Sequence, residues 1–286
     1  MLDLNRYFRY ISSSNNDLIK DIKQHLEGGV KANKLRKDSG LSCIEGIHLL
    51  RAWVDSKRIE ELTCVITSTT DINNSEISAI LIDLIQHCET NNFSYPDLII
   101  VDDSLAKNLS SLTNGPFIVG QVQIPSEVFS IKDNDNLVIL DSIQDSGNVG
   151  TILRTALAAG YRKIICTQGT ANIWSVKVLR AAMGAHTHLN FIESINPQDL
   201  LNDMKQSIYV TALDHEAVSL YKLGEALTQA HAFVFGNEGK GVNDIFINSG
   251  IKVFIPQDDG VESLNVSAAA AICLFEARRI NYLKTQ

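Results

Sequence analysis

The sequence predicts an α/β fold built from two domains. Its 286 residues, 45% hydrophobic and 20% charged, have the composition of a globular protein and the length of two ordinary domains. Short apolar runs that suit buried strands alternate with longer segments whose apolar residues recur at helical spacing, which is typical of strands and helices packed in layers. A stretch poor in apolar residues and rich in turn formers, 132–136, divides the chain.

Residues 1–125 are predicted to form a small α/β domain that begins with a polar leader. Apolar residues in the segment 44–54 have helical spacing. The clearest helix lies between Ile77 and Cys88, where apolar residues at i, i+3, i+4, i+7 and i+8 give one buried stripe. Strands are expected at residues 64–67, 98–101 and 117–124.

Residues 126–136 are the predicted linker, and residues 137–286 are predicted to be a doubly wound α/β domain. The apolar run 137–140 suits a buried parallel strand, and it ends at Asp141. A helical pattern starts at Val149 and ends at Gly160, a residue type that often closes helices in a left-handed conformation. Further strands are expected at residues 164–166, 188–192, 208–212, 232–235 and 252–255.

Charge and cysteine usage limit the classes of function. The formal net charge of −8 excludes a surface that is basic throughout, so any contact with RNA must be local. Five widely spaced cysteines with no CxxC pair indicate reduced core thiols. With no membrane span or signal-peptide pattern, the prediction is a cytoplasmic protein. One cluster of basic residues could contact RNA, although a solvated run of charges explains the cluster equally well. Its members are Lys31, Lys34, Arg36 and Lys37.

Three polar loops follow predicted strands, at the edge where open α/β sheets bind their ligands. The loop after residue 140 contains Asn148 and leads into a helix that contains Arg154. Asn148 stands at the expected N-cap of that helix, where a purely structural role is common. Arg154 lies off the apolar stripe of the helix, so it is either a surface arginine or one that faces a ligand.

The second loop, 235–242, packs three glycines beside Glu238 directly after an apolar run. Such dense glycines permit close approach of the backbone to a ligand, although the spacing matches neither a phosphate-binding nor a dinucleotide-binding loop. The third loop, 255–266, places Ser263 and Asn265 before an alanine-rich helix, which either residue could cap.

A metal site is not expected in the third loop. Asp258 and Asp259 are adjacent carboxylates with no spaced histidine or third acidic ligand, and such pairs are more often solvated.

Taken together, the three loops resemble the signature of the SpoU (TrmH-type) RNA 2′-O-ribose methyltransferases, a branch of the trefoil-knot (SPOUT) superfamily. The pattern N-x-G-x-x-x-R-T-A occupies residues 148–156, G-x-E-G-x-G occupies 236–241, and I-P…G-x-E-S-L-N-V occupies 255–266. The resemblance implies an α/β trefoil-knot methyltransferase domain at residues 137–286. More loosely, the N-terminal part resembles the small α/β substrate-binding domain of many family members.

The resemblance further implies a homodimeric enzyme that transfers a methyl group from S-adenosylmethionine to a ribose 2′-hydroxyl of RNA, ribosomal RNA in preference to tRNA. It makes Arg154 the residue that activates the hydroxyl. Because a guanidinium stays protonated, with a pKa above about 12, we expect Arg154 instead to stabilise the developing oxyanion and a neighbouring phosphate, paired with Glu238. The remaining catalytic residues expected are Asn148, Ser263 and Asn265, and main-chain contacts to the cofactor are expected at Gly236, Ile255 and Leu264.

Two positions depart from the family pattern. Ser146 stands where the family usually has proline, and Gln257 stands where it usually has methionine. Both changes are expected to alter loop stiffness or packing rather than to remove a reacting group.

Two other functions compete with the enzymatic one. A non-catalytic RNA-binding or ribosome-assembly protein could keep the methyltransferase fold, although it would have no reason to retain the polar residues of all three loops. A nucleotide-dependent oxidoreductase is disfavoured because the glycine fingerprint and the acidic ribose ligand are missing.

Overall fold

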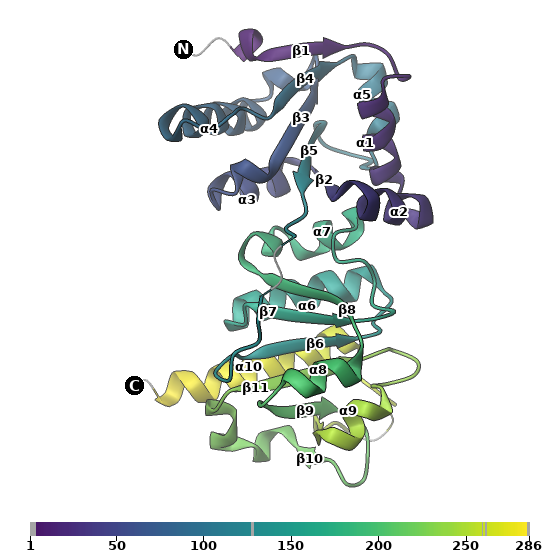
Figure 1. Ribbon diagram of the computed structural model, residues 1–286, viewed down its shortest axis with the longest axis vertical. Helices are drawn as coiled ribbons and strands as arrows, with labels where there is room; N and C mark the ends of the chain where they lie inside the picture. The colour runs from purple at the N-terminus through teal and green to yellow at the C-terminus, as the bar shows by residue number, and fades with distance from the viewer. Residues whose placement is uncertain (1–3, 127–128, 259, 261, 285–286) are drawn as a thin grey trace. The chain divides into compact units, whose positions relative to one another are not determined.

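The computed structural model describes residues 4–126, 129–258, 260 and 262–284, and the chain divides into two compact units (Figure 1). The first unit comprises Met1–Ser126 and Trp174–Thr187, and the second comprises Glu127–Ile173 and His188–Gln286. Among the described residues, no helix combines the length and the apolar character needed to cross a bilayer. The α/β class that the sequence predicts is confirmed in both units.

The first unit is a five-stranded mixed sheet with strand order β1-β4-β3-β5-β2. The three strands β1, β4 and β3 run parallel, whereas β5 is antiparallel to both of its neighbours. The strands are β1 (Phe8–Ile11), β2 (Leu41–Glu45), β3 (Leu62–Ser68), β4 (Asp97–Val101) and β5 (Ile118–Gln123). The helices are α1 (Asp17–Glu27), α2 (Gly29–Ser39), α3 (Ile47–Asp55), α4 (Ser75–Asn91), α5 (Asp103–Leu109) and α7 (Val176–Ala182), with short 3-10 turns η1 (Leu4–Tyr7), η2 (Ile59–Glu61) and η3 (Asp71–Asn73).

Helix α4 confirms the clearest helical prediction in this unit. Its apolar stripe is buried, and Asn74 caps its N-terminus by accepting hydrogen bonds from the backbone N–H groups of Glu76 and Ile77. The predicted helix over 44–54 is wrong at its start, because Ile44 belongs to β2 and the chain turns at Gly46, with a φ of 101°, before α3 begins.

The N-terminal residues, which the sequence suggests only as a polar leader, form β1 and α1 instead. Strand β1 lies at the edge of the sheet beside β4, so only Ile11 of its four residues is buried. Helix α1 buries one narrow stripe that includes Ile19 and Ile22. A half-exposed edge strand and an amphipathic helix need few apolar residues, and the segment therefore looks polar in sequence.

The second unit is a seven-stranded sheet in which every pair of neighbours is parallel, with strand order β10-β12-β9-β11-β6-β7-β8. The strands are β6 (Leu137–Asp141), β7 (Lys163–Thr167), β8 (Asn190–Ile195), β9 (Ser207–Thr211), β10 (Val218–Ser219), β11 (His231–Gly236) and β12 (Ile251–Phe254). The helices are α6 (Ser146–Ala159), α8 (Pro197–Asp203), α9 (Asp244–Ser249) and α10 (Val266–Lys284), with 3-10 turns η5 (Leu220–Lys222) and η6 (Gly224–Thr228). The turn η4 (Ala185–His188) belongs to the first unit up to Thr187.

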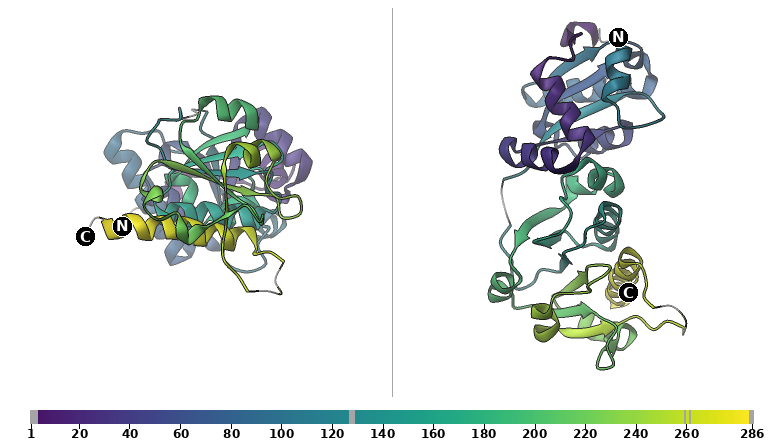
Figure 2. Two further views of the ribbon diagram at one scale, coloured as in Figure 1. Left: turned by 90° about the horizontal axis from the view of Figure 1, so that it is seen from below. Right: turned by 90° about the vertical axis from the view of Figure 1, so that its right-hand side faces the viewer.

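Helices cover both faces of this sheet, as the prediction of a doubly wound domain requires. On one face, alternate strand residues such as Ile139 and Val234 pack in a core that also contains Leu200 of α8 and Phe246 of α9. On the other face, α10 packs against α6 and β11. Figure 2 shows α10, in yellow, on the opposite side of the sheet from α8 and α9. Because both faces are covered, the central strands β6 and β11 are fully buried, which explains their uninterrupted apolar runs.

Strand β8 begins at Asn190, two residues later than predicted, because His188 ends the turn η4.

Part of the predicted linker, residues 126–136, packs against the second unit. Phe129 and Ile131 pack against the core of the second unit, and Asp135 forms an ion pair with Lys163.

Candidate functional site

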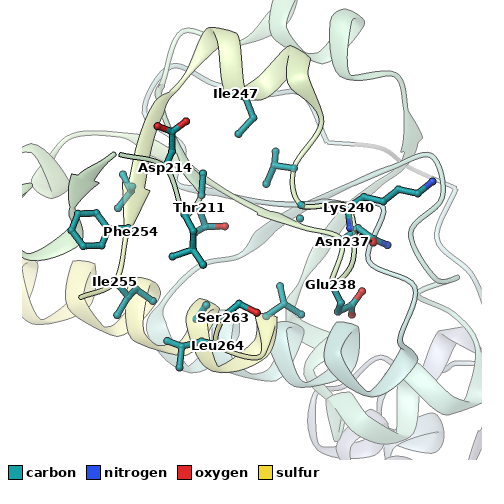
Figure 3. Close-up of a pocket in the computed structure, with 18 of the residues that line it drawn as sticks. Thr211, Asp214, Asn237, Glu238, Lys240, Ile247, Phe254, Ile255, Ser263 and Leu264 are labelled. Carbon is teal, nitrogen blue, oxygen red and sulfur yellow. Dashed lines mark hydrogen bonds between the residues drawn. The ribbon is translucent and has the colours of Figure 1, made fainter. Parts of the chain in front are cut away.

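A cavity of about 720 Å³ lies at the carboxyl ends of β9, β11 and β12 (Figure 3). This is the edge of a parallel sheet at which ligands bind in open α/β folds. Five segments line it: the end of β9, the glycine-rich turn after β11, helix α9, the end of β12, and the loop that leads into the start of α10. The cavity brings together six of the eight residues that the sequence predicts for the site: Gly236, Glu238, Ile255, Ser263, Leu264 and Asn265.

The turn after β11 folds back tightly on the end of its own strand. A Cβ atom on Gly236 would lie 2.5 Å from the carbonyl carbon of Gly241 and 2.5 Å from the nitrogen of Val242. Two backbone hydrogen bonds close the turn, from Asn237 N to Gly241 O at 3.0 Å and from Gly241 N to Asn237 O at 2.9 Å. Gly236 therefore permits a close backbone approach within the protein itself.

Asn148 joins two of the predicted site residues. Its side-chain Nδ2 donates to Glu238 Oε1 at 2.9 Å, and its Oδ1 accepts from Asn265 Nδ2 at 3.1 Å. The prediction that Asn148 caps α6 is wrong, because the helix begins three residues earlier and Asp145 caps it by accepting from Asn148 N at 2.7 Å. The Asn148 side chain is therefore free to connect the first loop to the other two.

Asn265 has two roles at once. Its Oδ1 accepts from Ser267 N at 2.9 Å and from Ala268 N at 3.4 Å, so it caps α10 as the sequence suggests. Its Nδ2 remains available to donate to Asn148. The cap fixes the orientation of the Asn265 amide. Defined hydrogen bonds consequently connect three side chains in series, those of Glu238, Asn148 and Asn265.

Arg154 lies apart from this chain of hydrogen bonds. It is exposed on α6 and is not among the residues that line the cavity. At 1.5 Å per residue, it is about 9 Å further along the helix than Asn148. The expected pairing of Arg154 with Glu238 is absent: among the described residues no ion pair or hydrogen bond involves the guanidinium, and Glu238 contacts Asn148 instead.

Asp214 is a cavity residue that the sequence reasoning missed. Figure 3 shows it at the opposite end of the cavity from Glu238 and Lys240. The ammonium group of Lys252 lies 2.8 Å from its carboxylate, and this hydrogen bond is the main reason that the pKa of Asp214 is lowered. Asp214 is the second residue after the predicted strand 208–212, so the rule of strand ends that singled out the other loops would have found it.

Two further missed residues, Asp141 and Asn237, hold the loops together. Asp141 is buried at the end of β6, where its carboxylate accepts from Asn243 N at 2.7 Å. Asn237 donates through Nδ2 to the carbonyl oxygen of Ser142 at 2.9 Å. Both lay within the loops identified from the sequence, but nothing in the spacing distinguishes a residue that ties loops together from one that binds a ligand.

The structure also shows where the two departures from the family pattern, Ser146 and Gln257, and the acidic pair of the third loop lie. Ser146 is the first residue of α6, a position that favours proline for its fixed φ but tolerates serine. Gln257 lines the cavity. Asp258 is exposed, and Asp259 lies outside the described residues.

Comparison with known proteins gives one family. The model of the SpoU rRNA Methylase family matches residues 135–275. Over 147 residues the chain is 34% identical to the 23S rRNA (guanosine(2553)-2'-O)-methyltransferase RlmP of Bacillus subtilis, covering 50% of this chain and 57% of that protein. It is 32% identical over 157 residues to an uncharacterized tRNA/rRNA methyltransferase of Borreliella burgdorferi, covering 54% of this chain and 68% of that protein. Alignments thus span about half the length of several curated relatives.

Among solved structures, the AdoMet-bound rRNA methyltransferase from Sinorhizobium meliloti superposes with a TM-score of 0.78 at 22% identity, covering 96% of this chain and 98% of that chain. The likeness extends over both units. The predicted α/β fold class is confirmed: a domain with a parallel sheet is preceded by a smaller α/β domain, a fold that the chain shares with this solved rRNA methyltransferase.

Proposed function

Because the chain belongs to the SpoU rRNA methylase family, we propose that it is an enzyme that transfers the methyl group of S-adenosylmethionine to a ribose 2′-hydroxyl of RNA. One observation carries the proposal. Glu238, Ser263 and Asn265 line a single cavity at the strand ends, and Asn148 is hydrogen-bonded to two of them.

The cavity fits S-adenosylmethionine in size and in chemistry. Its volume of about 720 Å³ lies within the range of roughly 300–1,000 Å³ that is typical of small-molecule sites. Gly236, Ile255 and Leu264 would hold the cofactor through main-chain groups and apolar surface, and Asp214 offers an acceptor for its hydroxyl or amino groups. The bound cofactor would supply a methyl group on a sulfonium, a good leaving group for transfer to oxygen.

Transfer to the ribose requires the hydroxyl to lose its proton as its oxygen attacks the methyl carbon in line with the leaving group, so placement of the reactants and of charge dominates catalysis. We assign Arg154 to the developing oxyanion and a neighbouring phosphate. Its exposure, and the lack of a protein partner among the described residues, leave the guanidinium available for both. Glu238, oriented by Asn148, would accept a hydrogen bond from the nucleotide, while Ser263 and Asn265 hold it.

Ribosomal RNA, rather than tRNA, is the proposed substrate. The family description names rRNA, and the first unit offers a local basic face on α2. Lys31, Lys34 and Lys37 are exposed there, and no ion pair among the described residues involves them. Arg36 does not belong to this face, because it is buried. Mapping ribose methylation in RNA from cells with and without the gene would identify the nucleotide; an unchanged ribosomal RNA would refute this choice.

A homodimer is also part of the proposal. Helix α10 exposes Phe275, Tyr282 and Leu283, which lie on one side of the helix at i, i+7 and i+8. Large apolar side chains grouped on an exposed surface favour a protein–protein contact. Light scattering coupled to size exclusion should give twice the chain mass of 31.5 kDa for the parent, and half that value for Phe275→Asp. A parent that remains monomeric at micromolar concentration would exclude the dimer.

The enzymatic proposal is tested by titration calorimetry with S-adenosylmethionine, followed by transfer of labelled methyl to ribosomal RNA and identification of the labelled nucleoside. We expect saturable binding and label in a 2′-O-methyl nucleoside. Glu238→Gln, which keeps the size of the side chain but removes its charge, should bind the cofactor and transfer methyl far more slowly, with a residual rate that can still be measured. No binding at millimolar cofactor would support the alternative, a non-catalytic RNA-binding or ribosome-assembly protein.

We also place the protein in the cytoplasm. All five cysteines are buried and free, as expected for a reducing compartment. Fractionation of cells that express a tagged chain checks this placement.

A further inference from the structure

We propose that Asn237 and Asp141 are positioning residues that hold the carboxylate of Glu238 against Asn148. The inference rests on the proposed methyl transfer, because it gives these two residues a function in that reaction. Neither is among the catalytic or cofactor-binding residues that the family resemblance implies. Their contacts join the glycine-rich turn after β11 to the loop after β6, and these two strands are neighbours in the sheet, with Gly236 opposite Asp141.

Asp141 fixes the far end of the turn. It is 3% exposed, and each of its carboxylate oxygens accepts one hydrogen bond: Oδ1 from Thr167 Oγ1 and Oδ2 from Asn243 N, both at 2.7 Å. Asn243 is the N-cap of α9 and the second residue after Gly241. A charged acceptor with both oxygens satisfied makes strong, directional contacts, so the point at which the chain leaves the turn is fixed to the end of β6.

Asn237 fixes the near end. Its Nδ2 donates to Ser142 O at 2.9 Å, and its Oδ1 accepts from Gly239 N at 2.9 Å and Lys240 N at 3.0 Å. Ser142 is itself held, because its N–H donates to Thr167 Oγ1 at 3.1 Å and its backbone has a φ of 57°. One amide therefore shapes the turn from inside and anchors it to the first loop.

Glu238 lies between these two anchors. Its side chain is exposed, so packing does not orient it, and among the described residues its hydrogen-bond partner is Asn148 Nδ2 at 2.9 Å. The direction in which Glu238 leaves the backbone consequently depends on the turn. Loss of the Asn237 amide removes three hydrogen bonds from the four-residue stretch that carries Glu238, and the carboxylate then loses its fixed place beside Asn148.

A double-mutant cycle tests the inference. Asn237→Ala should lower kcat for methyl transfer by about 10- to 100-fold in the parent, since misplacement by about 1 Å can cost that much. The same change should lower kcat by less than about 3-fold when Glu238 is already alanine. Asn237 acts on the reaction through Glu238, so its loss has little further effect once that carboxylate is gone. Asn248→Ala, a matched change on the exposed side of α9, should leave kcat unchanged. Equal losses from Asn237→Ala in both backgrounds would overturn the inference.

A second readout does not depend on activity. In protein labelled with ¹⁵N-asparagine, the side-chain amide signal of Asn148 should move in Asn237→Ala to the position that it takes in Glu238→Ala. A signal that stays at the parent position overturns the inference, whether or not the parent is active. A parent that transfers no methyl group contradicts the proposed function, and this result is separate from the position of the signal. If Asn237→Ala melts before it can be measured, Asp141→Asn is read by the same signal.

Discussion

Replacing Gly236 by alanine tests whether the turn after β11 shapes the cavity. The new Cβ would lie 2.5–2.6 Å from backbone atoms of Gly241 and Val242, whereas ordinary contact begins near 3.4 Å. The backbone must therefore move by about 1 Å although two hydrogen bonds close the turn. Overpacking of this kind costs about 1–3 kcal/mol. A loss near 2 kcal/mol lowers Tm by roughly 4–8 °C in a domain of this size.

The same displacement should weaken cofactor binding, because Gly236 and the turn line the cavity. We expect at least a tenfold rise in the Kd for S-adenosylmethionine, equivalent to about 1.4 kcal/mol. Titration calorimetry measures the Kd and scanning calorimetry the Tm. Gly239→Ala is the control, since a Cβ there meets only Asn237 Oδ1 at 3.7 Å. The reasoning is wrong if Gly236→Ala binds the cofactor as the parent does, or if the control loses as much affinity.

Three further predictions concern other parts of the chain. Arg154→Ala should abolish methyl transfer but leave the Kd for cofactor within about 2-fold of the parent, because Arg154 does not line the cavity; normal turnover would refute its role. Burial lowers the pKa of His25 from 6.5 to about 4, so the unfolded chain takes up the proton first as pH falls. Stability should be full above pH 6.5 and should fall by about 3 kcal/mol between pH 6.5 and 4. His25→Leu should flatten that fall in urea melts at pH 7 and 5, and parallel curves would contradict it. Glu45→Ala should lower the free energy of unfolding by about 2–4 kcal/mol, because it leaves Arg180 and three hydrogen-bond donors of Ser110 and Ser111 without their buried acceptor; Glu60→Ala, on an exposed side chain, should cost less than about 0.5 kcal/mol.

Sequence patterns predicted the second unit better than the first. The strands around residues 137–140 and 232–235 are buried on both faces, so their apolar runs have no polar interruptions and are easily recognised. The edge strand β1 and the stripe of α1 bury few residues each, and the leader was therefore not recognised as structure. Ile44 was assigned to a helix because a strand residue and a helix residue on either side of Gly46 happened to continue the same spacing.

In the site, the sequence identified residues better than it identified partners. Asn148 was expected to cap α6, but Asp145 precedes it by three residues and caps the helix by accepting from the backbone N–H of Asn148, which leaves the Asn148 side chain for Glu238 and Asn265. Arg154 was paired with Glu238 on chemical grounds alone, since opposite charges attract. Whether the two side chains can meet depends on the position of Arg154 along α6 and on the path of the loops in three dimensions, which a sequence pattern does not give.

The strand order of the second unit also determines when its parts can form during synthesis. Strand β6 lies between β7 and β11, yet β11 begins at His231, about 90 residues after β6 ends at Asp141. Pairings between such distant segments close slowly, and they cannot close before the later strand has left the ribosome. Strands β6, β7 and β8 can thus pair with one another early, while the edge of β6 that later pairs with β11 is still unpaired. The cavity needs β12 and the first turn of α10 as well, so it can form only after synthesis has passed Ala269.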